Sequence, residues 1–163
     1  MRRFRNVTKC ISCMAVALML CVMSGWFTQE VFAESGDGEQ DGIIYGYDTD
    51  SKEAYVYDYE GDATDIVIPE TLGGYTVKTI EIHYYGTEVK TLSIPSGVID
   101  CTIRSDRIGY IYVDEANQTF KSVDGALYTK DGKELVLYPY KESKDLVISE
   151  GTETIWYNAM SKL

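Results

Sequence analysis

A short apolar motif that recurs along the chain most constrains how this chain can fold. The motif, apolar-x-Ile-Pro, occurs in DIVIPETL at 65–72 and in TLSIPSGV at 91–98, and DLVISEGT at 145–152 repeats it with Ser149 in the place of the proline. The segment YIYV at 110–113 adds a further strand of the same kind. Two apolar residues alternate with their neighbours in each segment, which is the period of a half-buried β-strand. The chain is therefore expected to repeat a unit that begins with one short strand.

A unit of this size cannot bury its apolar side chains alone, but stacked units share a continuous core. Most units continue through a turn to a second apolar segment, such as Val77 and Ile80. We therefore expect a mostly β fold, a short repeat solenoid with a truncated repeat array. The residues predicted to face its core are Ile66 and Ile68, Leu92 and Ile94, Ile111 and Val113, and Leu146 and Ile148.

The residues between these inward positions must face outward, because side chains alternate along a strand. They are Asp65 and Val67, Thr91 and Ser93, Tyr110 and Tyr112, and Asp145 and Val147. Repeat proteins commonly bind on such a stacked surface, and tyrosine offers a large contact area with a polar tip. Tyr110 and Tyr112, with Thr91 and Ser93, are therefore the candidate ligand-binding residues. The alternative is that tyrosine simply suits an exposed strand.

Two hairpins interrupt or precede the repeats. Residues 42–61 place aromatic and apolar residues at alternate positions on both sides of the polar loop 48–51, which predicts an N-terminal β-hairpin. A second hairpin is expected as an insert at about 120–140, with its tight turn at Asp131-Gly132 and an earlier turn at Asp124-Gly125. The charged residues around that turn are expected to be solvated rather than catalytic.

The amino terminus indicates export. Residues 1–33 combine four basic residues, an apolar run and a cleavage pattern near Ala33, as a secretory signal peptide does. A retained membrane anchor is the alternative, but the apolar run is short for a span. After cleavage the chain is not expected to be an integral membrane protein. Residues 34–42 contain no large apolar residue and are expected to be a disordered acidic linker. The repeat domain is expected at 43–163.

Charge and composition exclude several functions. Without residues 1–33, 11 basic and 25 acidic residues remain, a net charge of −14, which disfavours nucleic acid and anionic lipid as partners. Cys101 is then the single cysteine, and His83 is the single histidine of the chain. Motifs for zinc, haem or nucleotide binding are absent, so we expect no cofactor, no metal and no enzyme activity. Asn117-Gln118-Thr119 matches the N-glycosylation sequon, which matters only in a host that uses it.

The Ile-x-Ile-Pro repeats and the insert resemble the BspA-like leucine-rich repeat family of bacterial surface and secreted proteins. The insert of that family carries an Asn…Phe-x-Ser-x-Asp-Gly-x-Leu-Tyr…Asp-Gly…Leu…Tyr-Pro pattern. Its residues correspond here to Asn117, Phe120, Ser122, Asp124, Gly125, Leu127, Tyr128, Asp131, Gly132, Leu135, Tyr138 and Pro139. The resemblance covers residues 43–163, although the family's Ala-Phe pair appears only as Ala159-Met160.

The resemblance implies a secreted or cell-surface leucine-rich repeat binding module, adhesin-like, that recognises an extracellular protein or glycan. A truncated array would expose Ile155, Trp156 and Met160 at its C-terminal edge, where a partner could dock. One alternative is a structural spacer segment of a larger envelope protein, and a secreted hydrolase is a third hypothesis.

Overall fold

A computed structural model describes residues 35–83, 89–104, 108–140 and 147–160 of the chain. The chain divides into two units, Met1–Phe32 and Ala33–Leu163. The signal peptide expected at 1–33 lies outside the described residues, so the fold below is that of the second unit. The described residues form strands, turns and irregular segments, and they contain no helix long and apolar enough to cross a membrane.

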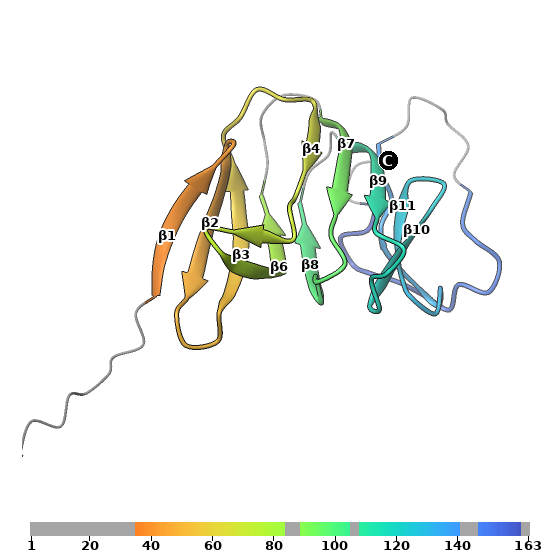
Figure 1. Cartoon of the computed structure of the whole chain (residues 1–163). Helices are drawn as coiled ribbons and strands as arrows, with labels where there is room; N and C mark the ends of the chain where they lie inside the picture. Colours follow the sequence, from red (N-terminus) through yellow and green to blue (C-terminus); the bar gives the residue numbers. More distant parts are fainter. Residues whose placement is uncertain (1–34, 84–88, 105–107, 141–146, 161–163) are drawn as a thin grey trace, which may run out of the picture. The chain divides into compact units, whose positions relative to one another are not determined.

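The first sheet combines an antiparallel meander with a parallel ladder (Figure 1). The meander consists of β1 (Ser35–Gln40), β2 (Ile43–Asp48) and β3 (Glu53–Tyr59). The third of these strands pairs in parallel with β6 (Tyr75–Ile82), which pairs in parallel with β8 (Asp100–Ile103) and antiparallel with β5 (Thr71–Leu72). The predicted N-terminal hairpin of β2 and β3 is confirmed, and it forms part of this larger sheet.

A second sheet stacks the recurring motif on itself. Its strands β4 (Asp65–Val67), β7 (Val89–Ile94) and β9 (Ile108–Val113) are all parallel. The chain passes from one sheet to the other and back, in the order β4, β6, β7, β8 and β9, so each turn of the chain adds one strand to each sheet. This arrangement is a β-solenoid, as the repeats predict.

The register of the second sheet brings the predicted inward residues together. Ile66, Leu92 and Ile111 are direct partners across the three strands, and all three are buried. They belong to one core cluster that also includes Val77 and Ile80 of the facing strand β6. Apolar side chains that recur at the same strand position therefore form a continuous core between the two sheets.

The prediction of a fourth strand in this ladder is wrong for the residues that the structure describes. Residues 147–149 form no strand, and the side chains of Val147 and Ile148 are 69% and 36% exposed. Leu146 and Asp145 lie outside the described residues. The insert takes the place of a fourth strand at β9, because the Ile111 N–H donates to the Gly125 carbonyl over 2.9 Å.

The insert forms a third sheet in the order β10 (Phe120–Val123), β11 (Ala126–Thr129), β12 (Glu134–Leu137) and β13 (Thr154–Ile155). The predicted hairpin is therefore present, but its tight turn lies at the other Asp-Gly pair. Asp124 and Gly125 have φ values of 50° and 81° and directly join β10 to β11. Asp131 has no positive φ, and Gly132 lies in a four-residue connection between β11 and β12.

The prediction that residues 34–42 form a disordered linker is also wrong. Residues 35–40 pair with β2 over their whole length, and Asp41-Gly42 makes the turn between the two strands. Gly36 and Gly38 leave room for aromatic rings, since a Cβ on either would lie 2.5 Å from the hydroxyl of Tyr47 or Tyr45. Large side chains from the neighbouring strand cover this segment, so it needs no apolar residues of its own.

Asn117 is the only buried polar residue of the described part of the chain. Its amide nitrogen donates to the carbonyls of Pro95 and Val98 over 3.0 and 2.9 Å. Its amide oxygen accepts from the N–H groups of Thr119 and Phe120, each over 2.8 Å. Both amide hydrogens are therefore engaged inside the fold, and the sequon is closed to glycosylation in the folded protein.

Candidate binding surface

The second sheet turns six side chains outward, and we call them the outer ladder. Asp65, Thr91 and Tyr110 are direct partners across β4, β7 and β9, and so are Val67, Ser93 and Tyr112. The structure thus brings all four predicted site residues onto one face. Their role in binding stays a prediction.

Tyr110 and Tyr112 form an aromatic pair at one end of the outer ladder. Their ring centroids are 4.5 Å apart, and the ring planes are tilted by 35°. The ring of Tyr110 lies on the tight turn of the insert, because a Cβ added to Gly125 would lie 2.5 Å from its Cδ2 atom. Tyr112 is 50% exposed. Tyr110 is thus packed against the turn at Gly125, while Tyr112 is exposed to solvent.

The polar members of the outer ladder link neighbouring strands. The Thr91 hydroxyl donates to Asp65 Oδ1 over 2.7 Å. This bond directs one carboxylate oxygen of Asp65 along the ladder, towards β7 rather than towards solvent. Ser93 lies between Val67 and Tyr112, where its small side chain leaves the two larger ones accessible.

A groove opens where the three strands end, and we call it the Pro95 groove. It has a volume of about 420 Å³. Its lining consists of the strand ends and the residues that follow them: Val67, Ile68, Pro69, Glu70, Ser93, Ile94, Pro95, Tyr112, Val113 and Asp114. Ile68 and Ile94 are buried beneath it, whereas Val67 is 66% exposed. The groove is therefore an apolar depression next to the outer ladder.

Two carboxylates border the groove, and both are fixed by backbone N–H groups. Glu70 accepts from Ser96 over 2.9 Å and from Gly97 over 3.3 Å. Asp114 accepts from Ala116 over 2.8 Å. Sequence reasoning missed both acids, although each follows closely on the end of a predicted strand.

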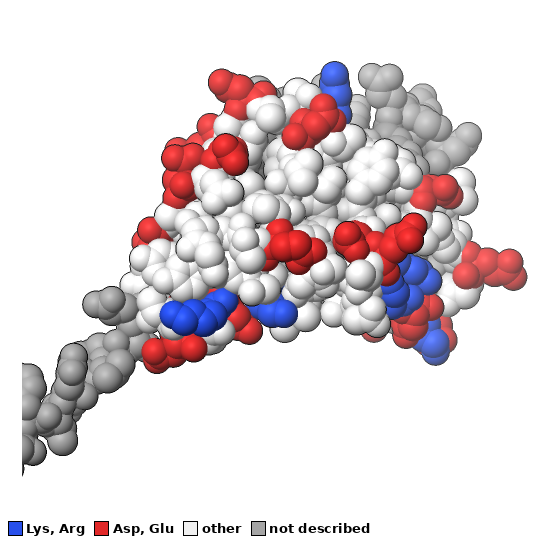
Figure 2. Space-filling view, in the orientation of Figure 1, with Lys and Arg blue, Asp and Glu red and all other residues white. Residues whose placement is uncertain are grey.

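Positive charge is sparse on this side of the molecule. Among the described residues, Lys133 forms an ion pair with Glu153 and His83 lies 3.5 Å from Glu81, and neither contact involves the groove. Figure 2 shows acidic side chains spread over the face that carries β4, β7 and β9, with basic ones mainly along its lower margin. The charges of Glu70 and Asp114 are thus not neutralised by a Lys or Arg of the described chain.

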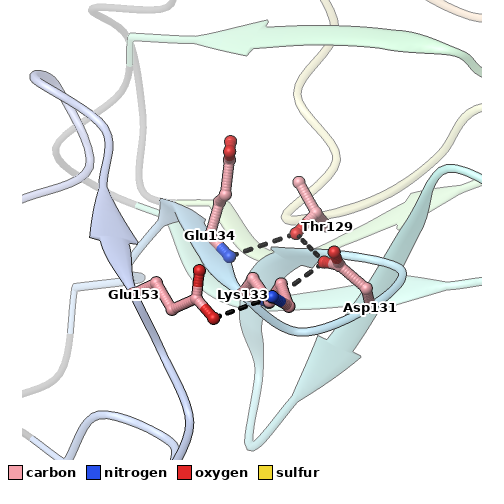
Figure 3. Close-up of polar contacts among 5 residues, drawn as sticks. All are labelled: Thr129, Asp131, Lys133, Glu134 and Glu153. Atoms are coloured by element: carbon pink, nitrogen blue, oxygen red, sulfur yellow. Dashed lines mark hydrogen bonds and ion pairs between the residues drawn. The ribbon is translucent and has the colours of Figure 1, made fainter.

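The charged residues of the insert build its longer connection, as Figure 3 shows. Asp131 accepts from the Thr129 hydroxyl over 2.7 Å and from the Lys133 N–H over 3.0 Å. The Lys133 N–H is the main cause that lowers the pKa of Asp131. Lys133 Nζ also contacts Glu153 over 2.7 Å. These residues therefore stabilise the connection between β11 and β12.

The expected C-terminal edge is only partly available. Ile155 is 46% exposed on β13, which no described strand pairs on its outer side. Trp156 packs against the core, and its indole N–H donates to Glu134 over 2.8 Å. Met160 is half-buried against the smaller core cluster. Tyr157, which the sequence does not single out, is 99% exposed beside them.

The reactive side chains are placed where they serve the structure. Cys101 is buried in β8, and desolvation raises the pKa of its thiol far above the ordinary value. His83 lies just beyond β6, 3.5 Å from Glu81. Within the part of the chain that the structure describes, no three His, Cys, Asp or Glu residues are grouped so as to hold a metal ion.

The architecture defines the class of protein: an all-strand solenoid built from short repeats, with an inserted hairpin. No protein-family model and no curated protein matches the chain. A solved leucine-rich repeat protein from Eubacterium ventriosum ATCC 27560 is similar at 14% identity, with a TM-score of 0.43 over 75% of this chain and 56% of that one. The pneumococcal vaccine antigen PcpA is similar at 14% identity, with a TM-score of 0.31 over 76% of this chain and 61% of that one. This chain thus spans less than two thirds of either protein.

Proposed function

We propose that this chain is a binding module that presents the outer ladder and the Pro95 groove to an extracellular protein or glycan. The observation that carries the proposal is the register of three parallel strands, which aligns Val67, Ser93 and Tyr112 beside an apolar groove. Exposed aromatic and aliphatic side chains at one site are typical of protein interaction surfaces.

Within this proposal, the chain is a BspA-like leucine-rich repeat protein of adhesin type, secreted or displayed on the cell surface. Its support is the sequence: the signal-like residues 1–33 and the insert motif. The acidic surface supports a partner other than nucleic acid. The buried thiol of Cys101 supports a role without catalysis, because a nucleophile must reach its substrate.

A structural spacer is the second candidate function, and the exposed apolar side chains near β13 favour it. Val147, Ile155 and Tyr157 would be covered if another repeat or a partner packed there. For a spacer, substitutions in the outer ladder would not change the binding of any ligand. A hydrolase would instead show turnover that disappears when one carboxylate is neutralised.

Changing Tyr112 to alanine tests the binding module. We expect retention on immobilised extracellular glycoproteins, or on glycans released from them, to fall about tenfold, because an exposed aromatic anchor is lost. The melting temperature should stay within 2 °C or so, since half of the ring is already in water. Tyr55→Ala is the matched control, because Tyr55 is 45% exposed on β3 of the other sheet. Equal losses in both variants, or an unchanged retention in Tyr112→Ala, would contradict the proposal.

A further inference from the structure

The Pro95 groove has apolar side chains that the described chain leaves uncovered. Val67 and Tyr112 lie on either side of Ser93, on the two outer strands of the ladder, and each exposes half or more of its surface. Neighbouring strands are about 4.8 Å apart, so the two side chains are separated by about 10 Å. This width admits an apolar side chain of a partner, and covering the pair would remove a contiguous apolar area from water.

Negative charge borders this apolar area on both sides of Pro95. Glu70 follows β4, and Asp114 follows β9, on either flank of β7. Their bonds to backbone N–H groups hold the carboxylates in place and leave the remaining oxygen lone pairs free for another donor. A carboxylate that is already oriented loses little freedom when it binds, which favours a partner with matching positive charge.

We propose that the occupant of the Pro95 groove is an extended cationic protein segment, with an apolar side chain between Val67 and Tyr112 and a Lys or Arg at each carboxylate. The inference rests on the proposed function and names the class of its partner. An Arg guanidinium can bind a carboxylate through two N–H groups, and it also interacts favourably with the face of a tyrosine ring. Acidic glycans fit poorly, because Glu70, Asp114 and the net charge of the full chain, −11, would repel them.

The matched variants remove negative charge and keep most of the side-chain hydrogen bonds. In the groove variant, Glu70→Gln with Asp114→Asn, the amide oxygens can still accept from the Ser96 and Ala116 N–H groups, and only the longer bond from the Gly97 N–H to Glu70 is lost. The control is Asp50→Asn with Glu53→Gln, which removes the same charge in the loop between β2 and β3 and at the first residue of β3. Melting curves of both variants of the full chain establish that each is folded.

The probes are two synthetic nonapeptides and a panel of neutral glycans, applied to the immobilised full chain. One peptide carries a leucine between two arginines, and the other carries glutamates in place of the arginines. We expect only the arginine peptide to be retained, with an affinity about fivefold lower for Glu70→Gln with Asp114→Asn and unchanged for the control. Raising NaCl from 50 to 300 mM should weaken retention by wild type more than by the groove variant.

The outcomes separate this inference from the proposed function. Absent or equal retention of the two peptides, or an arginine peptide insensitive to the groove variant, would overturn the cationic partner. Retention of a neutral glycan that is lost in Tyr112→Ala but not in the groove variant would overturn it too, while leaving the binding module standing. Retention of every probe unchanged in Tyr112→Ala would overturn both.

Discussion

At the scale of single residues, Asn117 connects parts of the chain that do not pair as strands. Its amide joins the turn after β7, through Pro95 and Val98, to the start of the insert at Thr119 and Phe120. A buried side chain with four hydrogen bonds specifies one conformation, because any shift leaves buried polar groups without partners. Asn117 therefore also fixes one side of the Pro95 groove.

Replacing Asn117 by alanine should lower the free energy of unfolding by about 3 kcal/mol, because two carbonyl and two N–H groups lose their partner. Urea unfolding measures the change. Gln118→Ala provides the control, since the exposed Gln118 donates only to the nearby Ala116 carbonyl. Similar stabilities of these two variants would show that the Asn117 amide is replaceable by water.

At the scale of elements, the tight turn between β10 and β11 supports both the ladder and the candidate site. The Gly125 carbonyl accepts from β9, and the Gly125 backbone lies under the ring of Tyr110. A side chain at Gly125 would therefore disturb Tyr110 of the outer ladder as well as the turn.

Gly125→Ala and Gly132→Ala make a matched pair, because the two glycines have φ values of 81° and 82°. Each alanine should cost about 1 kcal/mol of stability from the left-handed backbone alone. A Cβ at Gly132 meets only the flexible end of Lys121, whereas one at Gly125 meets the Tyr110 ring. We expect the near-ultraviolet circular dichroism of the tyrosines to change in Gly125→Ala only. The same spectrum for both variants would show that the turn does not position Tyr110.

The strand pattern could be predicted from sequence wherever alternation was strong. The apolar residues of β4, β7 and β9 indicated both their burial and the outward face, including Thr91 and Tyr112. The pattern failed at residues 147–149. Ile148 occupies the same motif position as Ile68 and Ile94, but the Gly125 carbonyl of the insert already accepts the hydrogen bond from β9 that a fourth strand would need. The pattern also failed at 35–40 because β1 has no large apolar residue of its own and packs against the rings of Tyr45 and Tyr47 on β2. Glu70 and Asp114 carry no local signal, since only the stacked strands bring them to one groove.

At the scale of the whole molecule, the excess of acidic residues couples stability to pH. The backbone N–H groups of Ser51 and Asp50 lower the pKa of Asp48, and that of Lys133 lowers the pKa of Asp131. A carboxylate with a lowered pKa in the folded state contributes stability that is present above its unfolded value of 3.8 and is lost as the pH falls through the folded value. Both turns should therefore weaken in acid.

We expect the urea midpoint of the chain to be higher at pH 6 than at pH 2.5. Asp48→Asn should reduce this difference, because asparagine can accept the same bonds without titrating. Asp50→Asn is the control, since the Asp50 side chain accepts neither of those bonds. A midpoint that rises in acid would mean that relief of charge repulsion outweighs the two turns.

The ladder aligns Ile66 with Leu92 and Leu92 with Ile111, so successive turns of the solenoid contain 26 and 19 residues. The strands thus keep the same register from turn to turn, while the segments that connect them differ in length. The connecting segments can gain or lose residues, as loops usually can, without moving the outward side chains. The outward face of the ladder and the length of the chain can therefore diverge independently, and a sequence comparison that assumes one fixed period would align only part of this protein.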